Sequence, residues 1–199
     1  MAVSASPPTV TVPASPFFRR ATSTSLPSPA STGEISVESS WAVAAAATRT
    51  FEAAFDALLA EHGVQAVPGA EEALVRLRAL GLHVCLCTGY ARHTQNMILE
   101  SLGWMGLADL SLSPDDAGRG VPYPDMILTA LLGLDLDDVR SVLVVGDTAE
   151  DMTAGRRAGA GLVVGVRTGR DADDVLLAAG ADRVVPGLAD VPDLVVRTR

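Results

Sequence analysis

From residue 82 to the end of the chain, short apolar runs alternate with single segments of helical period. The apolar runs occupy 82–88, 108–113, 141–147, 161–166 and 182–187, and the helical segments between them occupy 91–103, 125–134, 149–159 and 171–180. The runs are continuously apolar instead of alternating apolar with polar, so each is expected to be a strand buried on both faces. This pattern predicts an α/β fold built on a doubly wound parallel sheet.

Two helical patterns come before this alternation, and a compositionally different segment comes before both. Residues 41–62 predict one long alanine-rich helix, and residues 68–81 predict a second helix. Residues 1–40 are dominated by Ser, Thr, Pro and Ala, and their first acid is Glu34. Such a composition buries little apolar surface, so disorder is expected there, with "TVTV" at 9–12 as a weak strand signal.

The origin of residues 1–40 has two further interpretations. Their Ser-rich, Arg-containing, acid-poor composition is also that of an organellar transit peptide. The abrupt start of regular patterning near Trp41 alternatively indicates a misplaced start or a shifted reading frame upstream of a genuine domain.

Composition limits the function. The net charge of −9 offers no basic stripe for phosphate backbones, which argues against nucleic acid as a partner. The apolar runs are too short to span a bilayer, which argues against a membrane protein. All 15 basic residues are arginines, so no mechanism that needs a lysine amine is available. The two cysteines, Cys85 and Cys87, predict buried thiols on one strand face and a cytoplasmic protein.

Two acids follow the apolar run at 142–146, where a buried strand ends. Asp147 comes directly after the run and Asp151 four residues later. Thr148 and Asp151 fit a capping box, which explains Asp151 without any function. Asp147 lies instead at the carboxyl edge of the predicted sheet, where α/β proteins bind ligands. Two carboxylates at that edge favour a Mg²⁺ site, because hard oxygen ligands at this spacing suit that ion.

Two other positions could contact a phosphate. Thr88 ends an earlier strand and is followed by Gly89, so its hydroxyl could bind a phosphoryl oxygen, although a turn or helix cap explains it equally well. Arg119 stands in the loop "PDDAGRGVPYP" and could reach a phosphate, while a solvated surface arginine is the simpler interpretation.

These elements, in this order, resemble the haloacid-dehalogenase-like hydrolases, and more narrowly their phosphonatase-like branch. The similarity rests on a strand ending in Thr88-Gly89, the loop "GRGVPYPDMI" and above all the strand and helix "VVGDTAEDMTAGRRAGA". It implies a Mg²⁺-dependent hydrolase of small phosphorylated molecules, with a Rossmann-like core at 68–199 and a truncated helical cap at 41–67. In that family Thr88 would bind the transferring phosphoryl group, and Asp147 and Asp151 would hold magnesium.

The chain departs from the family pattern in three ways. The family places a nucleophilic Asp at the end of its first strand, whereas the first Asp here is Asp56, inside a predicted helix. Val121 stands where the family has a basic residue before the loop proline. The lysine that forms a Schiff base in phosphonoacetaldehyde hydrolases is absent. In that family the first strand is central, so either "TVTV" replaces it or the sheet lacks its middle.

Three functional hypotheses follow. The first is a hydrolase of this family that is catalytically impaired, because the nucleophile is missing. The second is a non-catalytic protein of the same family that binds phosphate, magnesium or a protein partner. The third is a receiver-type phosphoacceptor domain, against which the absence of lysine argues.

Overall fold

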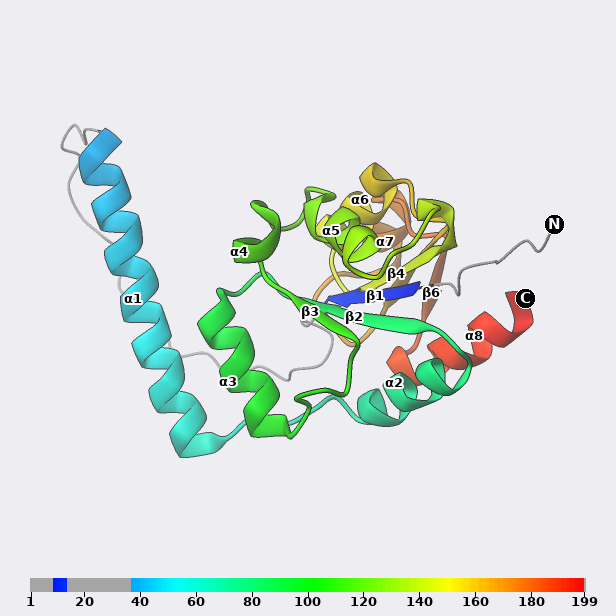
Figure 1. Cartoon of the computed structure of the whole chain (residues 1–199), viewed down its shortest axis with the longest axis horizontal. Helices are drawn as coiled ribbons and strands as arrows, with labels where there is room; N and C mark the ends of the chain where they lie inside the picture. The colour runs from blue at the N-terminus through cyan, green and yellow to red at the C-terminus, as the bar shows by residue number, and fades with distance from the viewer. Residues whose placement is uncertain (1–8, 14–36, 199) are drawn as a thin grey trace.

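The structure is a computed structural model that describes residues 9–13 and 37–198. Its centre is a parallel six-stranded sheet in the order β3-β2-β1-β4-β5-β6 (Figure 1). The strands are β1 Thr9–Pro13, β2 His83–Cys87, β3 Leu110–Leu112, β4 Val142–Gly146, β5 Leu162–Val166 and β6 Arg183–Val185. The helices are α1 Val37–His62, α2 Ala70–Ala79, α3 Arg92–Leu102, α4 Pro114–Ala117, α5 Asp125–Gly133, α6 Ala149–Ala158, α7 Asp173–Ala178 and α8 Val191–Thr198. The predicted α/β class and parallel sheet are confirmed.

The middle of the sheet is the short strand β1. It pairs in parallel with β2 on one side, where Thr9 lies opposite His83 and Pro13 opposite Cys87. On its other side Thr9 lies opposite Val142 in β4. Of the two alternatives for the centre of the sheet, the structure therefore has "TVTV" as the central strand.

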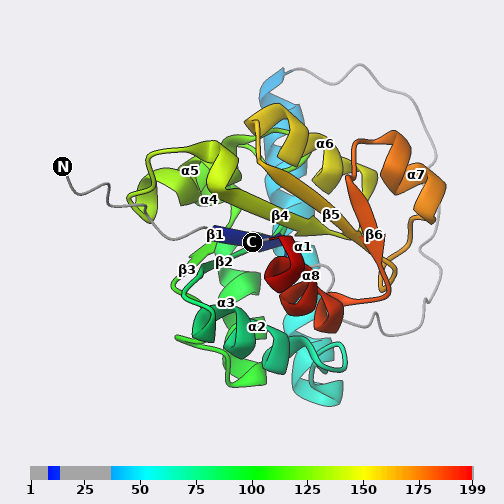
Figure 2. The same cartoon turned by 90° about the vertical axis from the view of Figure 1, so that its right-hand side faces the viewer.

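Helices cover both faces of the sheet, as Figure 2 shows. On one face α5, α6 and α7 pack over β4 and β5 around Met152, Leu176 and Val163, which are fully buried. On the other face α2 and α8 pack around Leu74 and Leu77. This two-sided cover is why the strands are continuously apolar, since neither face of β4 meets water.

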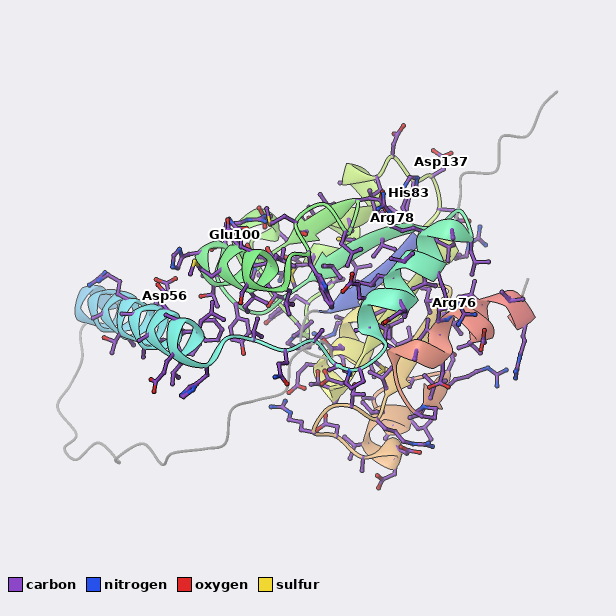
Figure 3. All side chains as sticks on the ribbon, turned by 90° about the horizontal axis from the view of Figure 1, so that it is seen from below. Asp56, Arg76, Arg78, His83, Glu100 and Asp137 are labelled. Atoms are coloured by element: carbon purple, nitrogen blue, oxygen red, sulfur yellow. The ribbon has the colours of Figure 1, made fainter. Side chains whose placement is uncertain are left out.

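The long helix α1 stands beside the sheet and not on it (Figure 1). It packs along α3, and the two helices are joined by a hydrogen bond of 3.0 Å between Asp56 Oδ2 on α1 and His93 Nε2 on α3. Asp56 is labelled in Figure 3, which shows α1 alongside α3. Tyr90, just before α3, stacks on Phe51 of α1 with ring centroids 6.0 Å apart. A polar contact and aromatic contacts therefore hold the helix to the core.

We expect the Asp56–His93 pair to be visible in a histidine titration. The hydrogen bond to Asp56 and the negative charges of Asp56 and Glu52 raise the pKa of His93 above its usual value, against an opposing effect of desolvation. Replacing Asp56 by Asn should therefore move the His93 titration to lower pH, as followed by NMR of the imidazole protons. Glu61→Gln, on the same helix, is the matched control and should leave the titration in place. An unshifted His93 in Asp56→Asn would mean that the pair does not form in solution.

The described elements differ from the predicted segments near both ends of the chain. The strand at 9–13 and the start of α1 at Val37 fall inside the segment 1–40 that was expected to be disordered. The expectation for residues 1–8 and 14–36 lies outside the described residues. The terminal helix α8 was not predicted. Among the described residues, no helix is both long and apolar enough to cross a membrane.

Candidate phosphate and metal site

The candidate site lies at the carboxyl edge of the sheet. Thr88 follows the last residue of β2 and Asp147 follows the last residue of β4, so both side chains stand at this edge. β1 lies between those two strands. At about 4.8 Å between neighbouring strands, the two positions are about 10 Å apart across the sheet. The structure thus brings two of the sequence-predicted residues to one edge, on either side of the end of β1.

Asp151 is buried in the first turn of α6, with 4% of its surface exposed. Its Oδ2 accepts three hydrogen bonds: from the backbone N–H of Asp147 at 3.2 Å, and from the backbone N–H and hydroxyl of Thr148 at 3.1 and 2.7 Å. The Thr148 hydroxyl oxygen in turn accepts from the N–H of Asp151 at 3.2 Å. The expected capping box is therefore present, and it commits one carboxylate oxygen of Asp151 to the backbone.

Gly146 makes this close approach possible. A Cβ added at Gly146 would lie 2.3 Å from Cβ and 2.7 Å from Oδ2 of Asp151. Only a residue without a side chain lets the strand end approach the first turn of α6 this closely. This explains the abrupt change from apolar residues to Gly-Asp in the sequence, because the glycine provides the space that the second acid fills.

Asp147 is 5% exposed, and the loop that follows β5 covers it. A Cβ at Gly169 in that loop would lie 2.1 Å from Asp147 Oδ2, so the glycine backbone lies directly against the carboxylate. Two residues further on, Asp171 Oδ2 accepts a hydrogen bond of 2.8 Å from the N–H of Ala149 at the start of α6. Sequence reasoning missed this loop. Its signal would have been Gly-Arg-Asp shortly after a buried strand, at the same sheet edge.

The charge of Asp147 affects the ionisation of the neighbouring Asp151. Burial and, to a smaller extent, the negative charge of Asp147 outweigh the lowering effect of the Thr148 and Asp147 hydrogen bonds, and together these effects raise the pKa of Asp151 to about 6. Desolvation penalises the charged form of the carboxyl group, and a second negative charge adds to that penalty. A cation between the two carboxylates would relieve both effects.

Thr88 is buried, with 3% of its surface exposed. Its backbone N–H donates to Leu112 O at 3.1 Å, and its hydroxyl oxygen accepts from the backbone N–H of Tyr90, also at 3.1 Å. The turn interpretation of this residue is therefore correct. It is also compatible with ligand binding, because a hydroxyl that accepts from a backbone N–H keeps its own proton to donate. The next residue, Gly89, is exposed.

The structure places Arg119 in a salt bridge on the surface. Its guanidinium donates to both oxygens of Asp125 at 2.7 and 2.8 Å and lies 4.3 Å from the centre of the Tyr123 ring. The hydrogen bonds from Arg119 hold the pKa of Asp125 below its usual value. Val121, in the position of the family's loop cation, packs against the apolar core.

A second arginine, which sequence reasoning missed, anchors the loops at this edge. Arg92, at the start of α3, forms an ion pair with Asp116, and its NH1 donates to Ser111 O at 3.1 Å. Burial raises the pKa of Asp116, but the hydrogen bonds from Arg92 and Ser113 outweigh it and bring the pKa to about 2. Arg92 is thus tied to α4 and β3. Two features of the sequence could have indicated it. Arg92 stands at the start of a predicted helix, and paired acids occur in the loop that follows the next strand.

A magnesium ion would find two protein carboxylates here. Asp147 and the remaining oxygen of Asp151 are the candidates, and no cluster of three or more His, Cys, Asp or Glu suited to a metal occurs within residues 9–13 and 37–198. Mg²⁺ usually keeps several waters and accepts one or two carboxylates, so this donor set fits it. The burial of two neighbouring acids, with the pKa of Asp151 raised, is the observation that favours a cation.

The central strand supplies no acid. β1 consists of Thr, Val, Thr, Val and Pro, and no Asp or Glu follows it in the sequence before Glu34. The position between Thr88 and Asp147 therefore lacks the carboxylate that would attack phosphorus.

A parallel α/β sheet covered by helices on both faces is a Rossmann-like fold. The family profile of haloacid dehalogenase-like hydrolases matches residues 20–159. This chain belongs to that family.

Curated relatives include phosphonoacetaldehyde hydrolases. That of Pseudomonas fluorescens (strain SBW25) is 33% identical over 102 residues, 51% of this chain and 37% of the relative. That of Bacillus cereus (strain G9842) is 33% identical over 94 residues, 47% of this chain and 36% of the relative. This chain therefore matches little more than a third of the length of these relatives.

Solved structures agree on the fold. A hydrolase from Pseudomonas syringae superposes with a TM-score of 0.68 at 27% identity, over 84% of this chain and 75% of the other. A phosphonoacetaldehyde hydrolase-like protein from Oleispira antarctica gives a TM-score of 0.60 at 27% identity, over 67% and 56%. A hydrolase of the same family from Deinococcus radiodurans, with bound phosphate and sodium, gives 0.63 at 28% identity, over 68% and 61%.

Proposed function

We propose that this protein binds a small phosphorylated molecule together with Mg²⁺ at the Thr88–Asp147 edge of the sheet, and turns it over very slowly. The observation that carries the proposal is the pair of buried acids, Asp147 and Asp151, beside a central strand without a carboxylate. The phosphate bound in the Deinococcus radiodurans neighbour supports the ligand class. The phosphonoacetaldehyde hydrolases among the relatives support a small organophosphorus substrate.

The residues of the site have separate roles in this proposal. The Thr88 hydroxyl donates to a phosphoryl oxygen while its oxygen keeps the turn closed through the Tyr90 N–H. Asp147 and Asp151 hold the metal, and Gly146 and the Thr148 cap fix where Asp151 stands. Bound Mg²⁺ would offset the negative charge of the phosphoryl group. Positioning and charge neutralisation alone bind the ligand, whereas forming a covalent phosphoenzyme needs the carboxylate that β1 lacks.

We expect binding and turnover to separate experimentally. Titration calorimetry with inorganic phosphate should show saturable binding that requires Mg²⁺ and weakens at least about tenfold in Asp147→Ala. Hydrolysis of p-nitrophenyl phosphate with Mg²⁺ should stay near the rate of the Asp147→Ala variant. Asp137→Ala is the matched control. Asp137 precedes β4 at the opposite edge of the sheet (Figure 3), and this variant should bind phosphate like the wild type.

The binding and the slow turnover in this proposal would be contradicted by different results. Robust turnover that Asp147→Ala abolishes would contradict the impairment and point to a nucleophile other than a β1 carboxylate. Absence of Mg²⁺-dependent phosphate binding in a folded wild-type protein would contradict the site itself.

A further inference from the structure

A cavity of about 320 Å³ lies between α1 and the turn that follows Thr88. Phe51 and Glu52 line it from α1, and Gly89, Tyr90 and Thr94 line it from the turn and the start of α3. Small-ligand pockets in proteins begin at about this size. Because Gly89 lines the cavity and directly follows Thr88, the cavity adjoins the candidate phosphate site.

One wall of the cavity is aromatic. The rings of Phe51 and Tyr90 are nearly parallel, with an interplanar angle of 20° and centroids 6.0 Å apart, and Phe55 tilts against Tyr90 at 5.9 Å. Phe51 is 48% exposed and Tyr90 39%, so ring surface remains open to a ligand. Exposed ring faces attract cations through their quadrupole as well as apolar groups.

The polar groups of the cavity are acidic or neutral, and none of the residues that line it is basic. Among the described residues Glu52 forms no salt bridge, and its charge contributes to raising the pKa of His93 across the helix interface. Thr94 is fully buried, and its hydroxyl has no hydrogen-bond partner in the described part of the chain. A buried hydroxyl without a partner is costly, and a ligand with a polar group could supply one.

These observations select the charge of the ligand. A carboxylate in the cavity would meet Glu52 with no cationic side chain among the described residues that line it, so phosphorylated acids are disfavoured. An ammonium group would meet the carboxylate of Glu52 and the faces of Phe51 and Tyr90 together. This combination of aromatic rings and one acid is how proteins hold quaternary ammonium ligands.

We infer that the cavity binds the ammonium group of a small amino-alcohol phosphoester. The inference rests on the proposed function for the phosphoryl end of the ligand, while the cavity accounts for the organic end. Thr88 and Gly89 then contact the phosphoryl group, and the next residue along the turn, Tyr90, contacts the cation. The substrate class is thus a phosphorylated alkyl ammonium compound.

Choline and its uncharged analogue 3,3-dimethylbutanol test the cavity without the phosphate site. They share shape and differ in charge, so calorimetry should show choline binding at least about tenfold tighter. Glu52→Gln should remove that preference, and Phe51→Leu, which keeps an apolar wall, should reduce it. Glu61→Gln, an exposed acid on the same helix, is the matched control and should bind choline like the wild type.

Phosphate binding distinguishes the two proposals. Glu52→Gln should leave Mg²⁺-dependent binding of inorganic phosphate unchanged and weaken binding of phosphocholine. Equal binding of choline and 3,3-dimethylbutanol, or equal choline affinity in Glu52→Gln and Glu61→Gln, would overturn the inference whatever the phosphate result. Tighter binding of phosphoglycolate than of phosphocholine would also overturn it. Loss of phosphate binding alone would contradict the proposed function and leave the choline comparison valid.

Discussion

Replacing Gly146 by alanine is expected to destabilise the protein by about 3 kcal/mol and to weaken Mg²⁺ binding. The new Cβ would lie 2.3 Å from Asp151 Cβ and 2.7 Å from its Cγ, well inside contact distance. Asp151 cannot yield by a rotamer change alone, because its own Cβ is in the way and Oδ2 is held by three donors. The start of α6 must therefore move away from β4, at the upper end of the cost of overpacking.

Thermal unfolding and calorimetry measure the two effects of Gly146→Ala. For a chain of this size, about 3 kcal/mol corresponds to a fall in Tm of about 6–12 °C. Gly89→Ala is the matched control: it follows the end of β2 in the same way, has no positive φ and would place its Cβ in open space. An unchanged Tm in Gly146→Ala would show that α6 does not pack against the strand end as described.

The sequence predicted the alternating strands and helices well because each apolar run is buried on both faces. The pattern over 141–147 led directly to β4 and to Asp147 at its end. The two candidate metal ligands could be predicted because the apolar pattern of a buried strand does not account for an acid at its end. The thiols of Cys85 and Cys87 are free and buried, as predicted from their spacing.

The central strand could not be placed from its own residues. "TVTV" is a weak strand signal, and its place comes from backbone pairing with β2 and β4 on either side, which no local pattern encodes. Gly169 and Asp171 were missed for a similar reason. They approach Asp147 and α6 only because β5 lies next to β4 in the sheet. Their residue types alone indicate nothing more than an ordinary turn.

The role of Arg119 shows a different limit. Its distance along the chain from Asp125 is six residues, and the loop between them turns back so that the two side chains pair. A sequence gives the charges of such a loop but not which acid its arginine meets. The structure provides Arg119 with a partner at the start of α5, and the prediction that it reaches a phosphate stays a prediction.

The metal-free protein is expected to gain stability as the pH falls from 8 to 5, and Asp151→Asn should remove the part of that gain that comes from Asp151. The pKa of Asp151 is raised in the folded protein from 3.8 to about 6, so folding disfavours the charged form. The cost is full above the folded value and is relieved as the pH falls towards the unfolded value. A difference of about 2 pKa units corresponds to about 3 kcal/mol at pH 8.

Asparagine keeps the shape of Asp151 and the amide oxygen can accept the same three hydrogen bonds, while the charge is lost. In EDTA at pH 8 the variant should therefore unfold at a higher temperature than the wild type, and Mg²⁺ should stabilise only the wild type. His93 also contributes less stability as the pH rises, since its pKa is raised, but it does so equally in both proteins. The difference in Tm between wild type and variant, followed from pH 5 to 8, isolates Asp151. If that difference did not grow with pH, the buried charge of Asp151 would not cost stability, and the physical case for a cation beside it would fail.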